Sequence, residues 1–162
     1  MDRLYAPWRS SYIKKDKSSD DQCPFCEAAA SNDDAKHHVL ERDGSLLVLL
    51  NRFPYNSGHL LIVPTAHVSD LELVARTVRA GMMEATAKWC AIVKKTFKCH
   101  GFNIGFNVGE VSGGSIPGHL HLHVVPRWQG DTNFLVTIGE TKLISSDLNE
   151  IYQQLLAAAA EK

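Results

Sequence analysis

Three histidines recur at every second position within the last third of the chain, at His119, His121 and His123. Alternate residues of a β-strand project to one face, so this pattern predicts three imidazoles in a row, roughly 6.5–7 Å apart. A neutral imidazole has one free ring nitrogen that can attack phosphorus, and neighbouring histidines can handle phosphate oxygens and protons. His-x-His can also offer two ligands to a hydrolytic zinc. Residues 113–127 contain no Asp or Glu, which disfavours that alternative.

A second group with chemical potential is the Cys23-Pro24-Phe25-Cys26 turn. Two cysteines at this spacing make half of a common zinc site, and a thioredoxin-like redox pair is the alternative. A redox pair normally follows an apolar strand, whereas Asp20, Asp21 and Gln22 precede this one, so the zinc interpretation is favoured. Cys90 and Cys99 fall on opposite sides of a predicted helix and are interpreted as buried or incidental thiols.

Composition limits the classes of protein to which these groups can belong. The chain has 162 residues, 44% of them apolar, and 17 Lys and Arg against 18 Asp and Glu. One domain over 1–162 is expected, and a net charge of −1 argues against a nucleic-acid partner. No run approaches 18 apolar residues and residues 1–17 lack an apolar signal core, so we expect a cytoplasmic protein without a membrane partner.

Short apolar runs separated by turns predict the strands that would position the histidines. An Asp43-Gly44 pair is a hairpin signal, and a glycine-rich loop at 109–118 joins the last two strands. These links favour antiparallel pairing, and hence an α+β domain with a sheet of about five strands. The expected strands are 39–42, 46–50, 59–63, 102–108 and 119–125.

Two helices are expected around this sheet. Apolar residues at three- and four-residue steps over 71–97 predict a long helix, capped by Ser69 or Asp70, with a possible kink at Gly81. It should end near His100-Gly101. A final helix over 147–161 begins with a capping-box-like pair, Asp147 and Glu150. Residues 1–32 are expected to be irregular.

With these residues in view, the chain resembles the histidine-triad (HIT) family. The segment His119-Leu-His-Leu-His-Val-Val is similar to the motif that names the family, and the loop from Asn51 to His59 is similar to its nucleotide-binding loop. The resemblance spans at least residues 23–127. It implies an α+β HIT fold, a homodimer and a nucleotide substrate. Segments 4–9 and 126–134 are similar to a bacterial branch that includes diadenosine tetraphosphate phosphorylases and hydrolases.

The resemblance also implies roles for individual residues. His121 would be the nucleophile that forms a nucleotidyl-histidine intermediate, with His123 and His59 contacting phosphate or assisting proton transfer. Asn51 would bind the ribose side. The other expected nucleotide-binding residues are Asn107, Gly114, Ser115 and His123. Ser115 and Ile116 stand where many members have Gln followed by Ser or Thr. The hydroxyl has either moved one place earlier or lost its role, and the backbone N–H groups of 113–115 can still be presented to phosphate.

The same resemblance completes the zinc site. In several branches two cysteines, a histidine after the third strand and the first triad histidine bind zinc, and the matching residues are Cys23, Cys26, His67 and His119. Four protein ligands leave no open position, so this zinc would be structural. His37, His38 and His100 have no expected role, and Arg127 and Trp128 either contact nucleotide or pack at an interface.

The expected activity is therefore cleavage of a dinucleoside polyphosphate, diadenosine tetraphosphate foremost, by hydrolysis or phosphorolysis. Two alternatives remain open: a nucleoside phosphoramidase of the same family, and a nucleotide-binding regulatory module with little turnover. A metal-dependent hydrolase is a more distant possibility.

Overall fold

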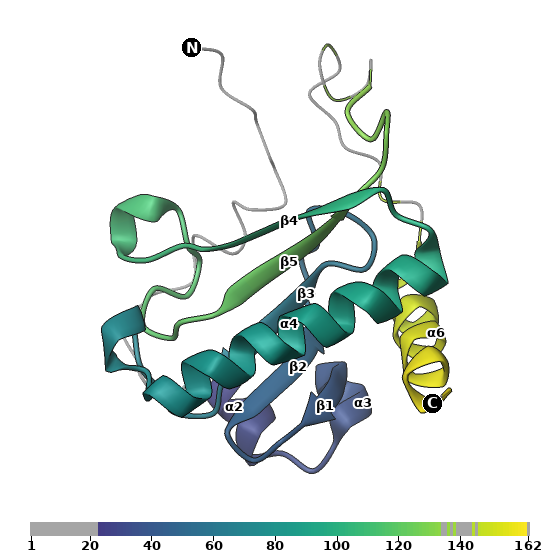
Figure 1. Cartoon of the computed structure of the whole chain (residues 1–162). Coiled ribbons are helices and arrows are strands. Elements are labelled where there is room, and N and C mark those ends of the chain that lie inside the picture. The colour runs from purple at the N-terminus through teal and green to yellow at the C-terminus, as the bar shows by residue number, and fades with distance from the viewer. Residues whose placement is uncertain (1–22, 134–135, 137, 139–143, 145, 162) are drawn as a thin grey trace.

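Within the described part of the chain, five strands form one antiparallel sheet in the order β1-β2-β3-β5-β4 (Figure 1). A computed structural model describes residues 23–133, 136, 138, 144 and 146–161, so segment 4–9 and Phe134 lie outside the described residues. The strands are β1 (Val39–Arg42), β2 (Leu46–Leu50), β3 (Leu60–Pro64), β4 (Gly101–Phe106) and β5 (Leu122–Arg127). The predicted α+β class and strand number are confirmed.

The β1–β2 hairpin forms where the Asp43-Gly44 pair predicts it. The Asp43 carboxylate accepts hydrogen bonds from the backbone N–H groups of Ser45 and Leu46, at 3.0 and 2.7 Å. Gly44 takes φ +87°, a conformation that a side chain would strain. Local turn chemistry therefore sets the register of the first two strands.

Only part of the histidine segment belongs to the sheet. β5 begins at Leu122, three residues later than expected, because the N–H of Leu120 bonds instead to the carbonyl of Val68, at 2.6 Å. It also continues past Pro126, which was expected to close it. The carbonyl of Pro126 points toward Asn56 and away from β4, and the N–H group that proline lacks would point the same way. Its absence therefore removes no hydrogen bond between β4 and β5.

The long helix is shorter than predicted at both ends. Leu71–Leu73 forms a separate 3-10 turn, η2, and α4 runs as one helix from Arg76 to Phe97. Lys98 ends it in the left-handed conformation, so Gly101 is free to start β4. Instead of a kink, Gly81 allows close packing: a Cβ there would lie 3.3 Å from a methyl carbon of Leu46.

Two short helices precede the sheet, and the first of them corrects the expectation that residues up to 32 are irregular. These are α2 (Pro24–Ala30) and α3 (Asp34–His37). Pro24 suits the first helical turn and three alanines follow, which is good local helix chemistry. α2 matters for function because it carries Cys26 and directs Phe25 against the sheet.

The sheet separates two apolar clusters. α4 and α6 (Leu148–Ala160) cover one face, where Leu120, Leu122 and Val124 join the larger cluster, and α2 covers part of the other face (Figure 1). The predicted C-terminal helix is confirmed, and the Asp147 carboxylate caps it by accepting from the N–H groups of Asn149 and Glu150. The histidines thus project away from α4.

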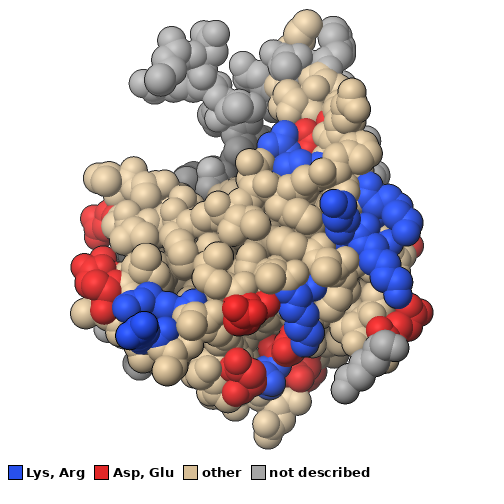
Figure 2. Space-filling view, viewed as in Figure 1, with Lys and Arg blue, Asp and Glu red and all other residues tan. Residues whose placement is uncertain are grey.

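The surface carries no single extended field of one sign on the face shown in Figure 2, where basic and acidic groups lie beside one another. This agrees with the near-zero net charge. None of the helices in the described ranges combines the length and the apolar character that crossing a membrane requires.

Candidate functional site

A line of imidazole rings crosses the face of the sheet opposite α4. The ring centroids of His121 and His123 are 4.8 Å apart, and those of His123 and His59 are 5.2 Å apart. His119 turns instead toward His67, with centroids 4.9 Å apart, and the Phe25 ring contacts both His119 and His121. The three alternating histidines therefore serve two different clusters.

Hydrogen bonds assign a tautomer to each ring near the nucleophile position. Nδ1 of His121 donates to the carbonyl oxygen of His119 at 2.8 Å, which leaves the lone pair on Nε2. Nδ1 of His59 accepts from the backbone N–H of Tyr55 at 3.1 Å and lies 3.2 Å from the amide nitrogen of Asn51. His59 therefore carries its proton on Nε2, 3.0 Å from Nδ1 of His123, so His123 holds its own proton on Nε2.

Burial keeps the rings of His59 and His121 neutral. His59 is fully buried, and burial, followed by repulsion from His123 and His121, lowers its pKa to about 3. Burial also lowers the pKa of His121. A neutral imidazole with its proton held on Nδ1 offers Nε2 as a nucleophile, which is the arrangement that phosphoryl or nucleotidyl transfer requires.

The depressed histidine pKa values predict that acid weakens the fold. The unfolded chain binds a proton on His59 below pH 6.5, whereas the folded chain does so only near pH 3. Stability is therefore fully present above pH 6.5 and falls by up to about 1.4 kcal/mol per pH unit between those values, with a further loss from His121. We expect urea unfolding of the wild type to show this loss between pH 7 and 5. His59→Gln should lose less over the same interval, and an equal loss would contradict the prediction.

The loop that delivers His59 is held by close packing and by a buried amide. Gly58 has φ +72°, and a Cβ there would lie 3.2 Å from the Phe97 ring of α4. Asn56 donates through Nδ2 to the Pro126 carbonyl and to the Asp131 carboxylate, both at 2.9 Å. Hydrogen bonds from the Arg127 guanidinium hold the pKa of Asp131 well below its usual range. Asn56 and Asp131 were not identified from the sequence, because 75 positions separate them.

In the loop expected to bind phosphate, Gly114 and Ile116 pack against other residues, whereas Ser115 is exposed. Gly114 lies against Asn107, since a Cβ at Gly114 would be 3.3 Å from the Asn107 Cβ. Ser115 is exposed, and Ile116 packs against the apolar cluster under α2. The departure from the family pattern at Ile116 therefore has a packing role.

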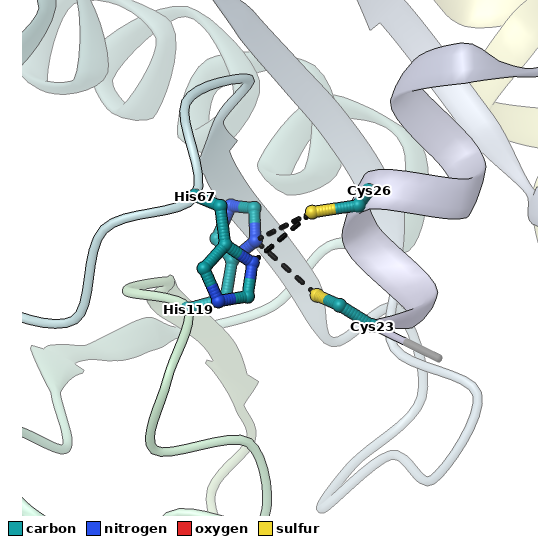
Figure 3. Close-up of side chains that lie close together, drawn as sticks. All are labelled: Cys23, Cys26, His67 and His119. Carbon is teal, nitrogen blue, oxygen red and sulfur yellow. Dashed lines mark hydrogen bonds between the residues drawn. The ribbon is translucent and has the colours of Figure 1, made fainter. Parts of the chain in front are cut away.

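The four expected metal ligands come together in space (Figure 3). The ligand atoms of Cys23, Cys26, His67 and His119 all lie within 4.8 Å of one another. Nδ1 of His119 is 3.3 Å from Sγ of Cys23, and Nδ1 of His67 is 3.1 Å from Sγ of Cys26. Tetrahedral zinc with Zn–S and Zn–N bonds near 2.3 and 2.05 Å places such atoms about 3.5 Å apart.

The surroundings of this cluster also fit a cation. Nε2 of His119 donates to the Pro64 carbonyl at 2.8 Å, which leaves the lone pair of Nδ1 facing the sulfurs. Without a metal, Nδ1 of His119 can instead carry a proton toward Cys23. Burial opposes ionisation of the Cys23 thiol, but that hydrogen bond and one with the backbone of Cys26 outweigh it and lower the pKa of the thiol to about 6. Two cysteines and two histidines, with one thiol that ionises near neutral pH, make a good zinc ligand set.

The residues left without a role from sequence are structural in the described chain. Trp128 packs against the larger core and donates to the Phe97 carbonyl at 3.2 Å, so it is a packing residue. His38 contacts Asn149 at 2.9 Å, and Nδ1 of His100 accepts from the N–H of Gln129. Cys99 is part of the larger core and Cys90 packs against it, and burial raises the pKa of both thiols.

Sequence reasoning missed two aromatic residues of the site. The Tyr55 ring stacks on His123 with centroids 5.9 Å apart and 19° between the planes, and it also contacts His59. Phe25 separates the nucleophile position from the metal cluster. The signal for Phe25 was its place inside the Cys-x-x-Cys turn, whereas Tyr55 gave none beyond its nearness to His59.

Comparison with known proteins agrees with this geometry. The HIT domain matches residues 32–130. AP-4-A phosphorylase of Mycobacterium tuberculosis is 39% identical over 97% of this chain and 83% of its own length. The asymmetrical bis(5'-nucleosyl)-tetraphosphatase of Schizosaccharomyces pombe is 27% identical over 62% of this chain and 52% of its own. A crystal structure of a Zn-bound histidine triad family protein from Mycobacterium smegmatis superposes with a TM-score of 0.72, at 28% identity, over 88% of this chain and 96% of that one. The chain therefore belongs to the HIT domain family.

Proposed function

We propose that this chain is an enzyme that cleaves dinucleoside polyphosphates, with diadenosine tetraphosphate as the foremost substrate. The observation that carries the proposal is the buried, neutral His121, whose Nδ1 proton is held by the carbonyl of His119 while Nε2 keeps its lone pair. The similarity to AP-4-A phosphorylase over nearly the whole chain supports the choice of substrate.

In the first step Nε2 of His121 attacks the α-phosphorus of one nucleotide. The bond from that phosphorus to the bridging oxygen breaks, and its electron pair leaves with the rest of the polyphosphate. The imidazole becomes cationic, and the His119 carbonyl stabilises that charge through the Nδ1 proton. His123, with its proton on Nε2, donates to phosphate oxygens or to the leaving group, and His59 supports it through the 3.0 Å contact.

In the second step an acceptor attacks the nucleotidyl-histidine and restores His121. We propose inorganic phosphate as this acceptor, because the phosphorylase relative matches 97% of the chain and the hydrolase relative matches 62%. We propose that Asn51, which contacts His59, binds the ribose of the retained nucleotide, and that Asn107, Gly114 and Ser115 make further nucleotide contacts.

Product analysis tests the reaction directly. Diadenosine tetraphosphate incubated with the protein and phosphate should give ADP and ATP, resolved by anion-exchange chromatography. Without phosphate, turnover should fall. AMP and ATP in equal amounts under both conditions would identify water as the acceptor, and cleavage of adenosine 5'-phosphoramidate alone would identify a phosphoramidase instead.

We further propose that Cys23, Cys26, His67 and His119 hold a structural zinc ion. The ion would tie α2 to the segment that precedes β5, and so help to fix Phe25 against His121. Four protein ligands leave no position for substrate, so the ion would stabilise the fold and take no part in the chemical steps.

We also propose that the protein is a cytoplasmic homodimer. β4 is an edge strand, and its central residues Asn103, Ile104 and Gly105 are exposed, with 47% of Ile104 accessible. Such an edge presents backbone groups that a second copy can pair. Light scattering after size-exclusion chromatography should give twice the chain mass, and a monomer at micromolar concentration would contradict this proposal.

A further inference from the structure

A groove on the sheet face begins beside the histidines and is not used by the steps above. It is an open groove with a volume of about 310 Å³, large enough for part of a small-molecule ligand, and is lined by Tyr55, Asn56, Asn103, Val125, Arg127 and Thr132. Tyr55 links it to the reaction centre, because the ring that lines the groove also stacks on His123.

Strand register shows that the groove continues the face that carries His123. On β5, His123, Val125 and Arg127 project to the same side, and their partners on β4 are Gly105, Asn103 and Gly101. Four residues of strand span about 13 Å, so the floor runs that far from His123 to Arg127. Gly105 and Gly101 have no side chain that would rise into the groove from β4. The space above them is open, since no atom lies within 4 Å of a Cβ built on either.

The lining is chemically mixed in a way that suits a nucleoside. The Tyr55 ring is 42% exposed and Val125 forms an apolar floor, so a base has surfaces to pack against. Thr132 brings a hydroxyl to the rim, and the Asn103 amide lies beside it with its oxygen accepting a hydrogen bond from the Arg127 guanidinium. Arg127 donates to both carboxylate oxygens of Asp131, at 2.6 and 2.8 Å, which fixes its plane and balances its charge. This balance favours a ribose and base over a bare polyphosphate.

The position of the groove relative to the reaction centre identifies which half of a substrate it can take. Asn51, expected on the ribose of the retained nucleotide, follows β2, whereas the groove lies over β5 and β4 on the other side of β3. We propose that this groove binds the nucleoside at the far end of the leaving polyphosphate. The proposal rests on the proposed function, because it takes a dinucleoside polyphosphate as the ligand.

The ligands that test it are diadenosine tetraphosphate and adenosine 5'-tetraphosphate, which differ only in the second nucleoside. Binding is measured by calorimetry in a His121→Asn background, which prevents turnover. We expect the dinucleotide to bind at least tenfold more tightly, and Asn103→Phe, which fills the floor opposite Val125, to remove that advantage. Asn103→Ala should reduce it less, since it opens the groove without filling it.

Met83→Ala is the matched control, because Met83 is 55% exposed on α4, which covers the opposite face of the sheet. It should leave both dissociation constants within twofold. Equal affinities for the two ligands before mutation, or an unchanged advantage in Asn103→Phe, would overturn the proposal. Failure of the proposed function is a separate outcome: the wild type would bind both ligands with the expected difference and yet release no product.

Discussion

Replacing His121 with Asn is expected to lower the rate of diadenosine tetraphosphate cleavage by at least about 10⁴-fold, equivalent to about 5.5 kcal/mol of barrier. Asparagine can keep a hydrogen bond to the carbonyl of His119, but its amide nitrogen has no lone pair available for attack. The variant should fold, since Asn is smaller than His and the Phe25 contact is a packing one. The measurement is the initial rate of ATP release by the wild type and the variant at equal concentration.

A matched substitution separates loss of the nucleophile from general damage. His100→Gln changes a histidine whose only described role is to accept a hydrogen bond from the N–H of Gln129, and it should leave the rate within twofold. Mass spectrometry of wild-type protein quenched during turnover should find one nucleotidyl group, which His121→Asn should lack. A variant that retains more than a tenth of the wild-type rate would assign the nucleophile to another residue.

Period-two patterning explains why the core and the triad could be read from the sequence. The alternation of His119 to Val124 holds for any extended backbone, so Leu120 and Val124 reach the core although Leu120 lies outside the β-ladder. Asp-Gly and helix-cap chemistry are similarly local, and they gave the first hairpin and the start of α6 correctly. The resemblance to a family supplied the grouping of the metal ligands.

What could not be predicted depends on contacts between distant segments. The tautomer of His59 follows from the N–H of Tyr55, and the loop around Asn56 follows from Asp131, which only the folded sheet brings near. The division of the triad is likewise tertiary: His119 turns away because Pro64 and the cysteines offer it partners. The start of α4 was misplaced because apolar spacing at 71–74 continues the helical period across a 3-10 turn.

Loss of the metal cluster is expected to have the largest effect on stability. Cys26→Ser replaces a thiolate with a poor zinc ligand, and structural zinc contributes folding free energy directly. We expect the free energy of unfolding to fall by about 3 kcal/mol or more, and the zinc content, measured by mass spectrometry of the metal, to fall from one ion per chain to a small fraction. Chelation of the wild type should produce the same loss.

Cys90→Ser is the matched control, because this half-buried thiol borders the core on α4 and lies outside the cluster. It should keep one zinc per chain and lose about 1 kcal/mol or less. Folded Cys26→Ser at low temperature should retain measurable turnover, since the ion would position Phe25 and the His119 segment without touching substrate. A wild type that binds no zinc, or a Cys26→Ser variant as stable as Cys90→Ser, would show that the four side chains hold the fold together through their own contacts. Complete loss of turnover in the folded, zinc-free variant would instead indicate that the position of His121 depends on the ion.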